Sequence, residues 1–318
     1  MKNMQSLNNE SKKIMSRWKP RIGFIGQGFI GKNLADDFER RKYSVVRYAL
    51  EKPYIENKEH ISTCDIVFIA VPTPTTPQGF IDTALRHVLP LVGKGKVAVI
   101  KSTILPGKTE EMQKEFPHCL VLHAPEFLTE KSAVLDTQKP QRNIVGIPKN
   151  TKRYREVAEQ VLRVLPKATF EMQCLAREAE LIKYAGNCYL ANRVVFMNAL
   201  YDLAMVEGVR YEVITKAMSA DTRIGGTHMK VVDNSGHKGA KAGRGAGGHC
   251  FPKDLAALRL HAEEKLGKGS RSARLLERLE DINLQLLCES KKDMDLLTEI
   301  YGQTALESYS LVKKRQPK

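Results

Sequence analysis

The chain has 318 residues, enough for two domains with a sizeable core, and its 42% hydrophobic and 27% charged residues exclude a disordered protein. No apolar run approaches the roughly 18 residues of a membrane-spanning helix, so we expect no membrane segment. The net charge is +15, and the basic residues are spread along the chain. They form no basic stripe with aromatic residues interleaved. This distribution argues against nucleic acid and is compatible with a site for phosphorylated ligands.

The two ends are polar and basic. Residues 1–20 lack the apolar core of a signal peptide, and we expect a flexible leader there and a loose basic tail over 306–318. The six cysteines are scattered, with no spacing typical of a zinc site. We therefore expect reduced thiols, a cytoplasmic location and no bound metal.

A short apolar strand at 21–26 runs into the spacing Gly26-x-Gly28-x-x-Gly31 and then into a helix. This order is typical of a dinucleotide-binding turn, in which the first glycine turns the chain, the second lets a pyrophosphate approach and the third permits close helix–strand packing. The helix N-terminus would bind the phosphates. The alternative is a merely structural glycine turn. The predicted cofactor contacts here are Gly26, Gly28, Phe29, Ile30 and Gly31.

The second strand, at 43–50, bears on the choice between NAD and NADP. NAD-binding domains usually carry an acidic residue near its end, where this chain has Ala49. Glu51 is positioned to replace it, whereas Arg47 and Lys52 would tolerate a 2′-phosphate. The sequence favours NAD and leaves the choice open.

Further apolar strands are predicted at 65–71, 96–101, 119–122 and 143–147, so we expect a doubly wound parallel sheet, a Rossmann domain, over 21–172. Ligands bind such folds at the carboxyl ends of the strands. Two loops lie there, and they contain Val71, Pro72, Thr73, Ser102 and Thr103. Glu126 and Glu130 follow another strand end, are four residues apart and are predicted to share a helical face.

An uninterrupted helical pattern runs over 178–207 and ends at Gly208. At 1.5 Å per residue this helix is about 45 Å long, too long for one small core. We expect it to connect the domains, to form a homodimer interface over 178–208 and to organise an all-α domain over 173–305. Lys183 and Asn187 would project from one of its faces.

A glycine-rich stretch at 243–248 leads to Cys250 and to a helix with Pro252 in its first turn. A thiol at a helix N-terminus feels the positive end of the helix dipole, which favours the thiolate. Lys253 and Asp254 add a cation and a proton partner. The glycines indicate that something approaches the backbone closely, so we favour a reactive cysteine over a buried structural one.

Taken together, these stretches resemble the UDP-glucose/GDP-mannose dehydrogenase family. The matching motifs occur in the family's order between residues 20 and 290: Gly26-x-Gly28-x-x-Gly31, Val71-Pro72-Thr73-Pro74, Lys101-Ser102-Thr103, Pro125-Glu126-Phe127-Leu128, Glu180-x-x-Lys183-x-x-x-Asn187, Arg223-Ile224-Gly225 and Gly247-Gly248-x-Cys250-Phe251-Pro252-Lys253-Asp254.

The resemblance implies an NAD-dependent, four-electron oxidation of a sugar nucleotide's C6 alcohol to a carboxylate, with UDP-glucose the favoured substrate. Cys250 would form a thiohemiacetal and then a thioester. Lys183 and Asn187 would stabilise the oxyanion. The remaining roles are proton and water handling by Asp254, Thr103 and Glu130, a further site role for Glu126, and sugar binding by Phe127, Leu128, Lys183, Asn187, Gly247, Cys250 and, across a dimer, Arg223.

The resemblance is incomplete. The 318 residues contain no counterpart of the family's C-terminal nucleotide-binding domain, and 223–250 is extended and basic. A partner chain would supply that domain, or the sugar end alone would hold the substrate, or the basic segment would bind the phosphates. Two other functions compete: an NAD-binding regulatory subunit, and a two-electron hydroxyacid dehydrogenase of the 6-phosphogluconate type, which has no need for Cys250.

Overall fold

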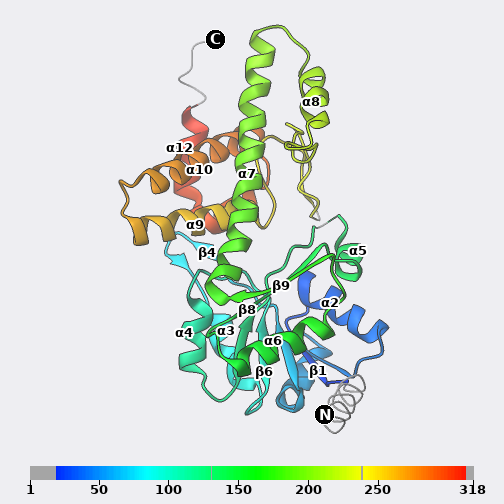
Figure 1. The fold of residues 1–318 in the computed structure, drawn as a ribbon. Helices are drawn as coiled ribbons and strands as arrows, with labels where there is room; N and C mark the ends of the chain where they lie inside the picture. Colours follow the sequence, from blue (N-terminus) through cyan, green and yellow to red (C-terminus); the bar gives the residue numbers. More distant parts are fainter. Residues whose placement is uncertain (1–18, 130, 238, 313–318) are drawn as a thin grey trace.

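The computed structural model describes residues 19–129, 131–237 and 239–312. Most of the expected leader, Glu130 and residues 313–318 of the expected tail lie outside this part of the chain. The described part comprises a seven-stranded sheet with helices on both faces, followed by a helical region (Figure 1).

The strand order in the sheet is β2-β1-β3-β6-β7-β8-β9. The strands are β2 (Val45–Tyr48), β1 (Ile22–Ile25), β3 (Ile66–Ile69), β6 (Val97–Ile100), β7 (Leu120–His123), β8 (Arg142–Ile147) and β9 (Phe170–Leu175). Ile25, at the end of β1, pairs with Tyr48 on one side and Ile69 on the other. The first five strands are parallel, as predicted. β8 pairs antiparallel with β7, so β8 and β9 run the opposite way. The expected parallel orientation was wrong for β8, and β9 was not predicted.

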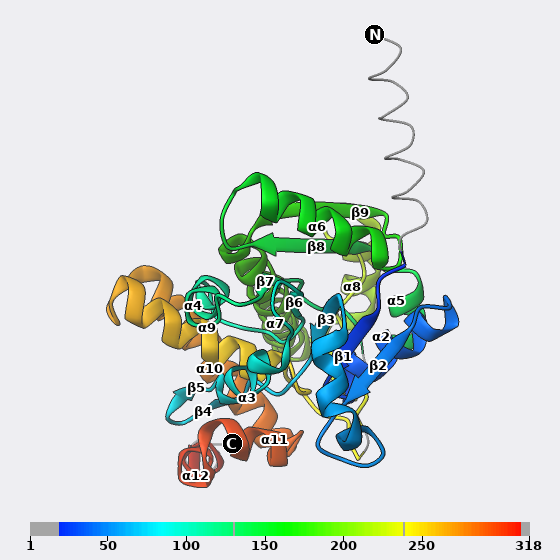
Figure 2. The same cartoon turned by 90° about the horizontal axis from the view of Figure 1, so that it is seen from below.

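Two hydrophobic layers enclose the sheet, which explains why its inner strands are continuous apolar runs. One layer joins the strands to α2 (Phe29–Arg40) and α6 (Lys152–Val164). The other joins them to the 3-10 segments η1 (Tyr54–Thr63) and η2 (Leu89–Leu91) and to α3 (Thr83–Val88) and α4 (Lys108–Glu115). Figure 2 shows α2 and α4 on opposite sides of the sheet. The Rossmann-like, doubly wound architecture is confirmed.

The long helix α7 (Ala176–Val206) leads away from the sheet (Figure 1). It packs against α9 (Phe251–Leu266) and α10 (Arg271–Ser290) on one side, and α8 (Tyr211–Ala220) lies on the other. The helices α11 (Met294–Tyr301) and α12 (Gln303–Val312) complete the region. Two small elements, the hairpin β4 (Thr75–Thr76) and β5 (Gly79–Phe80) and the helix α5 (Ala133–Gln138), belong to loops of the sheet domain. Within the described residues, no helix is both long and apolar enough to cross a membrane.

Two expected boundaries and one expected helix differ from the structure. The division at 172/173 falls inside β9, which the sequence did not reveal because the strand is half-exposed and lacks an apolar run. Residues 306–312 belong to α12 rather than to a loose tail, and Leu306 is buried against α10. Residues 124–129 have no helical structure, so the expected helical face at Glu126 was also wrong.

Candidate functional site

The glycine turn between β1 and α2 has the geometry that its spacing predicted. Gly26 adopts φ +89°, and a Cβ there would lie 2.2 Å from the Ala70 carbonyl oxygen. A Cβ on Gly31 would lie 1.9 Å from the Gly26 carbonyl oxygen, so α2 packs directly on the turn. Gly28, the residue preceding α2, has no atom within 4 Å of its would-be Cβ. The turn is therefore packed against the protein at Gly26 and Gly31, and it leaves open space at Gly28.

Two loops at the carboxyl edge of the sheet are joined to each other. The Ser102 hydroxyl donates to the Val71 carbonyl oxygen, and the Thr73 hydroxyl donates to that of Thr103, each at 2.7 Å. At the end of β2, Ala49 is buried and Glu51 is exposed. Arg47 forms ion pairs with Asp36 and Glu39 of α2. Its guanidinium is already neutralised, so this residue is poorly suited to bind a 2′-phosphate.

The beginning of α7 is fixed to the sheet domain by Glu180, whose side chain is fully buried. Its carboxylate accepts from the backbone N–H groups of Gly107 and Thr109, at 2.6 and 2.8 Å, and thereby caps α4. Burial raises the pKa of Glu180, and these hydrogen bonds only partly offset that effect. Because α7 is rigid, this anchor sets the positions of Lys183 and Asn187 one and two turns further along.

A cleft of about 1030 Å³ opens between α7, α8 and the segment that precedes α9. Cys250 lies at its edge, exposed, immediately before the first residue of α9, as the sequence predicted. The other predicted site residues that line the cleft are Phe127, Leu128, Lys183, Asn187 and Gly247. The predicted residues in this lining lie up to 123 positions apart in the sequence, from Phe127 to Cys250, and the fold brings them to one cavity.

Asn187 and Asp254 join the two helices beside the cleft. The Asn187 side-chain amide donates to Asp254 Oδ2 at 2.5 Å, and the Lys253 ammonium lies 2.5 Å from Asp254 Oδ1. The Asp254 side chain is only 1% exposed, so its carboxylate holds Asn187 rather than facing the cavity. The Tyr184 hydroxyl is buried nearby, and burial, followed by the negative charge of Asp254, raises its pKa well above the usual value.

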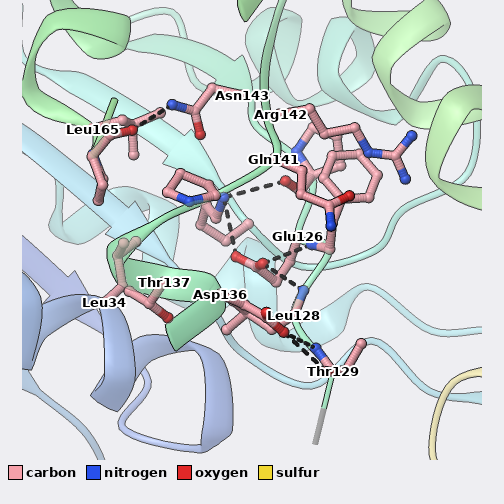
Figure 3. A pocket seen from close by; sticks show the side chains of 15 residues that line it. Leu34, Glu126, Leu128, Thr129, Asp136, Thr137, Gln141, Arg142, Asn143 and Leu165 are labelled. Atoms are coloured by element: carbon pink, nitrogen blue, oxygen red, sulfur yellow. Dashed lines mark hydrogen bonds and ion pairs between the residues drawn. The ribbon is translucent and has the colours of Figure 1, made fainter. Parts of the chain in front are cut away.

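Glu126 lines a smaller pocket of about 180 Å³ (Figure 3), which shares Phe127, Leu128 and Arg142 with the cleft. Its carboxylate accepts from the backbone N–H groups of Phe127 and Leu128, at 2.6 and 2.9 Å, and lies 3.3 Å from the Lys101 ammonium. These contacts fix the course of the segment 126–128. The Arg142 guanidinium covers the Phe127 ring at 3.8 Å, and the Lys183 ammonium lies 5.6 Å from the same ring.

Not every predicted residue reaches the cleft. Thr103 and Glu126 are absent from its described lining. Arg223 is also absent; its side chain is 87% exposed and pairs with Asp221. Glu130 lies outside the described residues, so its position is not tested.

Two features near the site were missed from the sequence. The His123 side chain, at the end of β7, is fully buried with no hydrogen-bond partner on either ring nitrogen among the described residues. Burial, followed by the charge of Lys101, lowers its pKa to about 3. The second is the turn between α10 and α11, whose Asp293 carboxylate accepts a hydrogen bond from the Gly248 N–H at 2.7 Å. No local sequence pattern relates residue 293 to residue 248.

Comparison with known proteins identifies the family. Residues 51–165 match the NAD binding domain of the UDP-glucose/GDP-mannose dehydrogenase family, and residues 177–285 match its central domain. The chain belongs to the UDP-glucose/GDP-mannose dehydrogenase family. It is 32% identical over 214 residues to the UDP-glucose 6-dehydrogenase of Rhizobium meliloti, covering 63% of this chain and 46% of that protein. The chain spans about half the length of the curated relatives it matches.

Solved structures agree with the fold expected for this dehydrogenase family. A UDP-glucose dehydrogenase from Pyrobaculum islandicum superposes with a TM-score of 0.70 at 25% identity, covering 85% of this chain and 70% of that one. A 3-hydroxyisobutyrate dehydrogenase from Mycobacterium tuberculosis superposes with a TM-score of 0.65 at 17% identity, covering 92% and 99%. The second likeness concerns the fold alone.

The glycine turn suits the dinucleotide of an NAD binding domain. The family match begins at residue 51, so this fit rests on the geometry of the turn itself. The space above Gly28, next to the N-terminus of α2, is where a pyrophosphate would approach the backbone. A side chain at Gly28 would fill that space.

Proposed function

We propose that this chain is a nucleotide-sugar 6-dehydrogenase that oxidises the C6 alcohol of the sugar to a carboxylate with NAD, most simply UDP-glucose to UDP-glucuronate. The observation that carries the proposal is one cleft that contains Cys250, Lys183 and Asn187. A thiol, a cation and an amide donor are the groups that covalent oxidation of an aldehyde requires. Similarity to UDP-glucose 6-dehydrogenases supports this assignment.

The glycine turn and the loops at Val71–Thr73 and Ser102–Thr103 would hold NAD, which would accept two hydrides per sugar. The C6 alcohol loses the first hydride and a proton to become the aldehyde, and the cysteine adduct formed next loses the second hydride and a proton. The Cys250 sulfur attacks the C6 aldehyde to give a thiohemiacetal. Oxidation of that adduct leaves a thioester, which water hydrolyses to the acid and the free thiol. Lys183 and Asn187 stabilise the negative charge that develops on the C6 oxygen, because both are donors on the wall of the same cleft.

Asp254 acts on this chemistry mainly through Asn187. Its carboxylate orients the Asn187 amide and balances the charge of Lys253. Thr103 and Glu130 remain candidates for managing the hydrolytic water. Glu126 is better placed to hold the segment 126–128, whose Phe127 and Leu128 would contact the sugar.

The charge of the cleft supports an anionic substrate. The cations in its lining include Lys131, Arg142, Lys183, Lys216, Lys230 and Lys292, against the acids Glu212 and Asp233. Lys131 lies 3.6 Å from Asp233. Lys216 and Lys230 have no acidic partner within 4 Å among the described residues, and both would attract a diphosphate. We assign the phosphates of the nucleotide to these two lysines, on α8 and on the basic segment that follows it.

A second copy of the chain is the partner we propose for α7. Four large apolar side chains recur along one face of this helix, and each is between 48% and 64% exposed: Leu181, Tyr189, Phe196 and Leu203. An apolar stripe of this length on one helix fits pairing with a second helix. In a dimer Arg223, which is exposed and absent from the cleft lining of its own chain, would be available to the substrate of the partner. Cys64, Cys119, Cys174, Cys188 and Cys288 form no disulfide among the described residues, which fits a cytoplasmic enzyme.

The test is NADH production by the purified protein with NAD and a panel of UDP-glucose, GDP-mannose and UDP-N-acetylmannosamine, together with the product mass. We expect two NADH per sugar acid with one of these donors. Cys250→Ser should abolish acid formation, whereas Cys174→Ser, on β9 away from the cleft, should not. One NADH per product would favour a two-electron dehydrogenase. NAD binding without turnover would favour a regulatory subunit.

A further inference from the structure

The glycine-rich stretch that precedes Cys250 is packed against the turn between α10 and α11. A Cβ on Gly247 would lie 2.2 Å from Asp293 Oδ2 and 2.8 Å from Lys292 Cε. A Cβ on Gly243 would lie 2.7 Å from Ser290 Oγ. The glycines predicted that a group approaches this backbone closely. Part of that group is the protein's own turn between α10 and α11. A Cβ at either position would force side chains that pack against the loop to shift.

The turn holds the loop through its polar groups. The Lys292 ammonium, 4% exposed as a residue, donates to the Gly245 carbonyl oxygen at 3.0 Å. The Asn283 side chain of α10 accepts from the Ala246 N–H at 2.7 Å and donates to its carbonyl oxygen at 3.0 Å. Successive residues of the loop are thus fixed by groups from the C-terminal helices.

Asp293 makes the last of these contacts, and its side chain has no solvent exposure. Oδ2 accepts from the Gly248 N–H at 2.7 Å and from the Ser235 hydroxyl at 2.5 Å, and Oδ1 lies 2.9 Å from His237 Nε2. Burial by itself would raise the pKa of Asp293, but the hydrogen bonds from Ser235, Gly248 and His237 outweigh it and lower the pKa. The carboxylate is ionised and bonded on both oxygens.

The backbone of the turn is shaped for this contact. Lys291 and Asp293 both adopt left-handed conformations, with φ of +54° and +53°. Residues with side chains seldom adopt this conformation, and where they do it is often at a functional site. Here it directs Asp293 at the loop, while Lys292 between them reaches the carbonyl oxygens.

We infer that Asp293 is a positioning residue for Cys250: it fixes the Gly248 N–H, two residues before the thiol, and so sets where the sulfur lies in the cleft. The effect on catalysis rests on the proposed function, whereas the effect on the loop does not. Asp293 is not itself a residue of the described cleft lining, but it bonds Gly248 and Ser235, which are. It therefore acts through the loop.

The test compares Asp293→Ala, Asp293→Asn and the control Asp295→Asn, an exposed residue in the first turn of the next helix. Backbone hydrogen exchange of a peptide covering 244–250 should accelerate at least tenfold in Asp293→Ala, with 251–266 unchanged. Asp293→Asn should restore most of the protection, because its amide oxygen still accepts from Gly248. Asp295→Asn should leave exchange unchanged.

The kinetic readout is kcat against KM for the nucleotide sugar that the wild type oxidises. Asp293→Ala should lower kcat at least tenfold while KM changes less than threefold, with partial recovery in Asp293→Asn. Unchanged exchange at 244–250, or equal acceleration over 251–266, would overturn the inference. If the wild type oxidises no sugar nucleotide, the proposed function fails, but the exchange experiment still decides the role of Asp293.

Discussion

The Asn187 amide donates to the Asp254 carboxylate at 2.5 Å and thereby links the middle of α7 to the first turn of α9. Asn187 lines the cleft with Cys250, whereas Asp254 is buried behind it. The amide that would stabilise the oxyanion is thus oriented by a charged group that the substrate does not reach. Its orientation depends on the packing of two helices rather than on one loop.

This link predicts different effects for two substitutions of Asn187. Asn187→Ala removes the donor and should cost about 1–3 kcal/mol of stability, because Asp254 loses a hydrogen bond while buried. Turnover should fall about 10²–10³-fold, as when an oxyanion donor is removed.

Asn187→Asp places a second carboxylate against Asp254 and raises the pKa of the pair. Its stability should therefore be lowest above neutral pH and should recover as the pH falls, which urea unfolding at pH 5 and pH 8 would measure. Equal stability of the two variants at pH 8 would contradict the assigned contact.

The glycine turn makes a second prediction, concerning NAD. Gly28→Ala should leave the fold intact, because nothing lies within 4 Å of the added carbon, but should weaken NAD binding at least tenfold by filling the pyrophosphate space. Gly31→Ala should instead destabilise the protein, since its Cβ meets the Gly26 carbonyl oxygen. Gly269→Ala, also in open space, is the matched control. Calorimetric titration with NAD, paired with thermal unfolding, separates the effects. Undiminished NAD affinity in Gly28→Ala would show that NAD does not bind at this turn.

The basic lining of the cleft makes a third prediction. Lys216→Glu and Lys230→Glu should each raise KM for the nucleotide sugar about tenfold with a smaller change in kcat, because they bind a part of the substrate away from the reacting carbon. The increase should shrink at high ionic strength, where the attraction in the wild type is already screened. Lys268→Glu makes the same charge change in the turn after α9, outside the cleft lining, and should change neither constant. Equal KM changes in all three variants would indicate a non-specific charge effect.

The reactivity of the cysteines makes a fourth prediction that needs no substrate. Burial raises the pKa of Cys64, Cys119 and Cys174 to about 11 and that of Cys188 to about 12. At pH 8 these groups remain thiols, which are poor nucleophiles. Iodoacetamide should therefore label the exposed Cys250 first, and peptide mass spectrometry would give the order. Labelling of the half-buried Cys174 at the same rate as Cys250 would contradict this prediction.

The parts that the sequence revealed are local patterns. The glycine spacing, the apolar strands, α7 and the thiol before α9 each depend on a few neighbouring residues, and the structure contains all of them. Two features that the sequence did not reveal depend on distant residues. They are β9 at the sheet edge and the contact of Asp293 with Gly248. Glu126 was wrongly expected on a helix because its spacing from Glu130 is helical. The Glu126 carboxylate accepts hydrogen bonds from the next two backbone N–H groups, which competes with a helix.

The buried His123 makes the last prediction, on acid stability. An unfolded imidazole takes up a proton near pH 6.5, whereas burial keeps the pKa of His123 at about 3. Between these values the unfolded state binds more protons, so stability is present above pH 6.5 and is lost as the pH falls. From pH 7 to pH 5 this one group should cost about 2 kcal/mol. His123→Gln cannot titrate, so its free energy of unfolding should decrease by that much less over the same interval, as urea titrations would show. His87, an exposed histidine of α3, provides the control, because His87→Gln should follow the wild-type pH dependence. If all three proteins lose stability equally, His123 is protonated in the folded state and is not held neutral by burial.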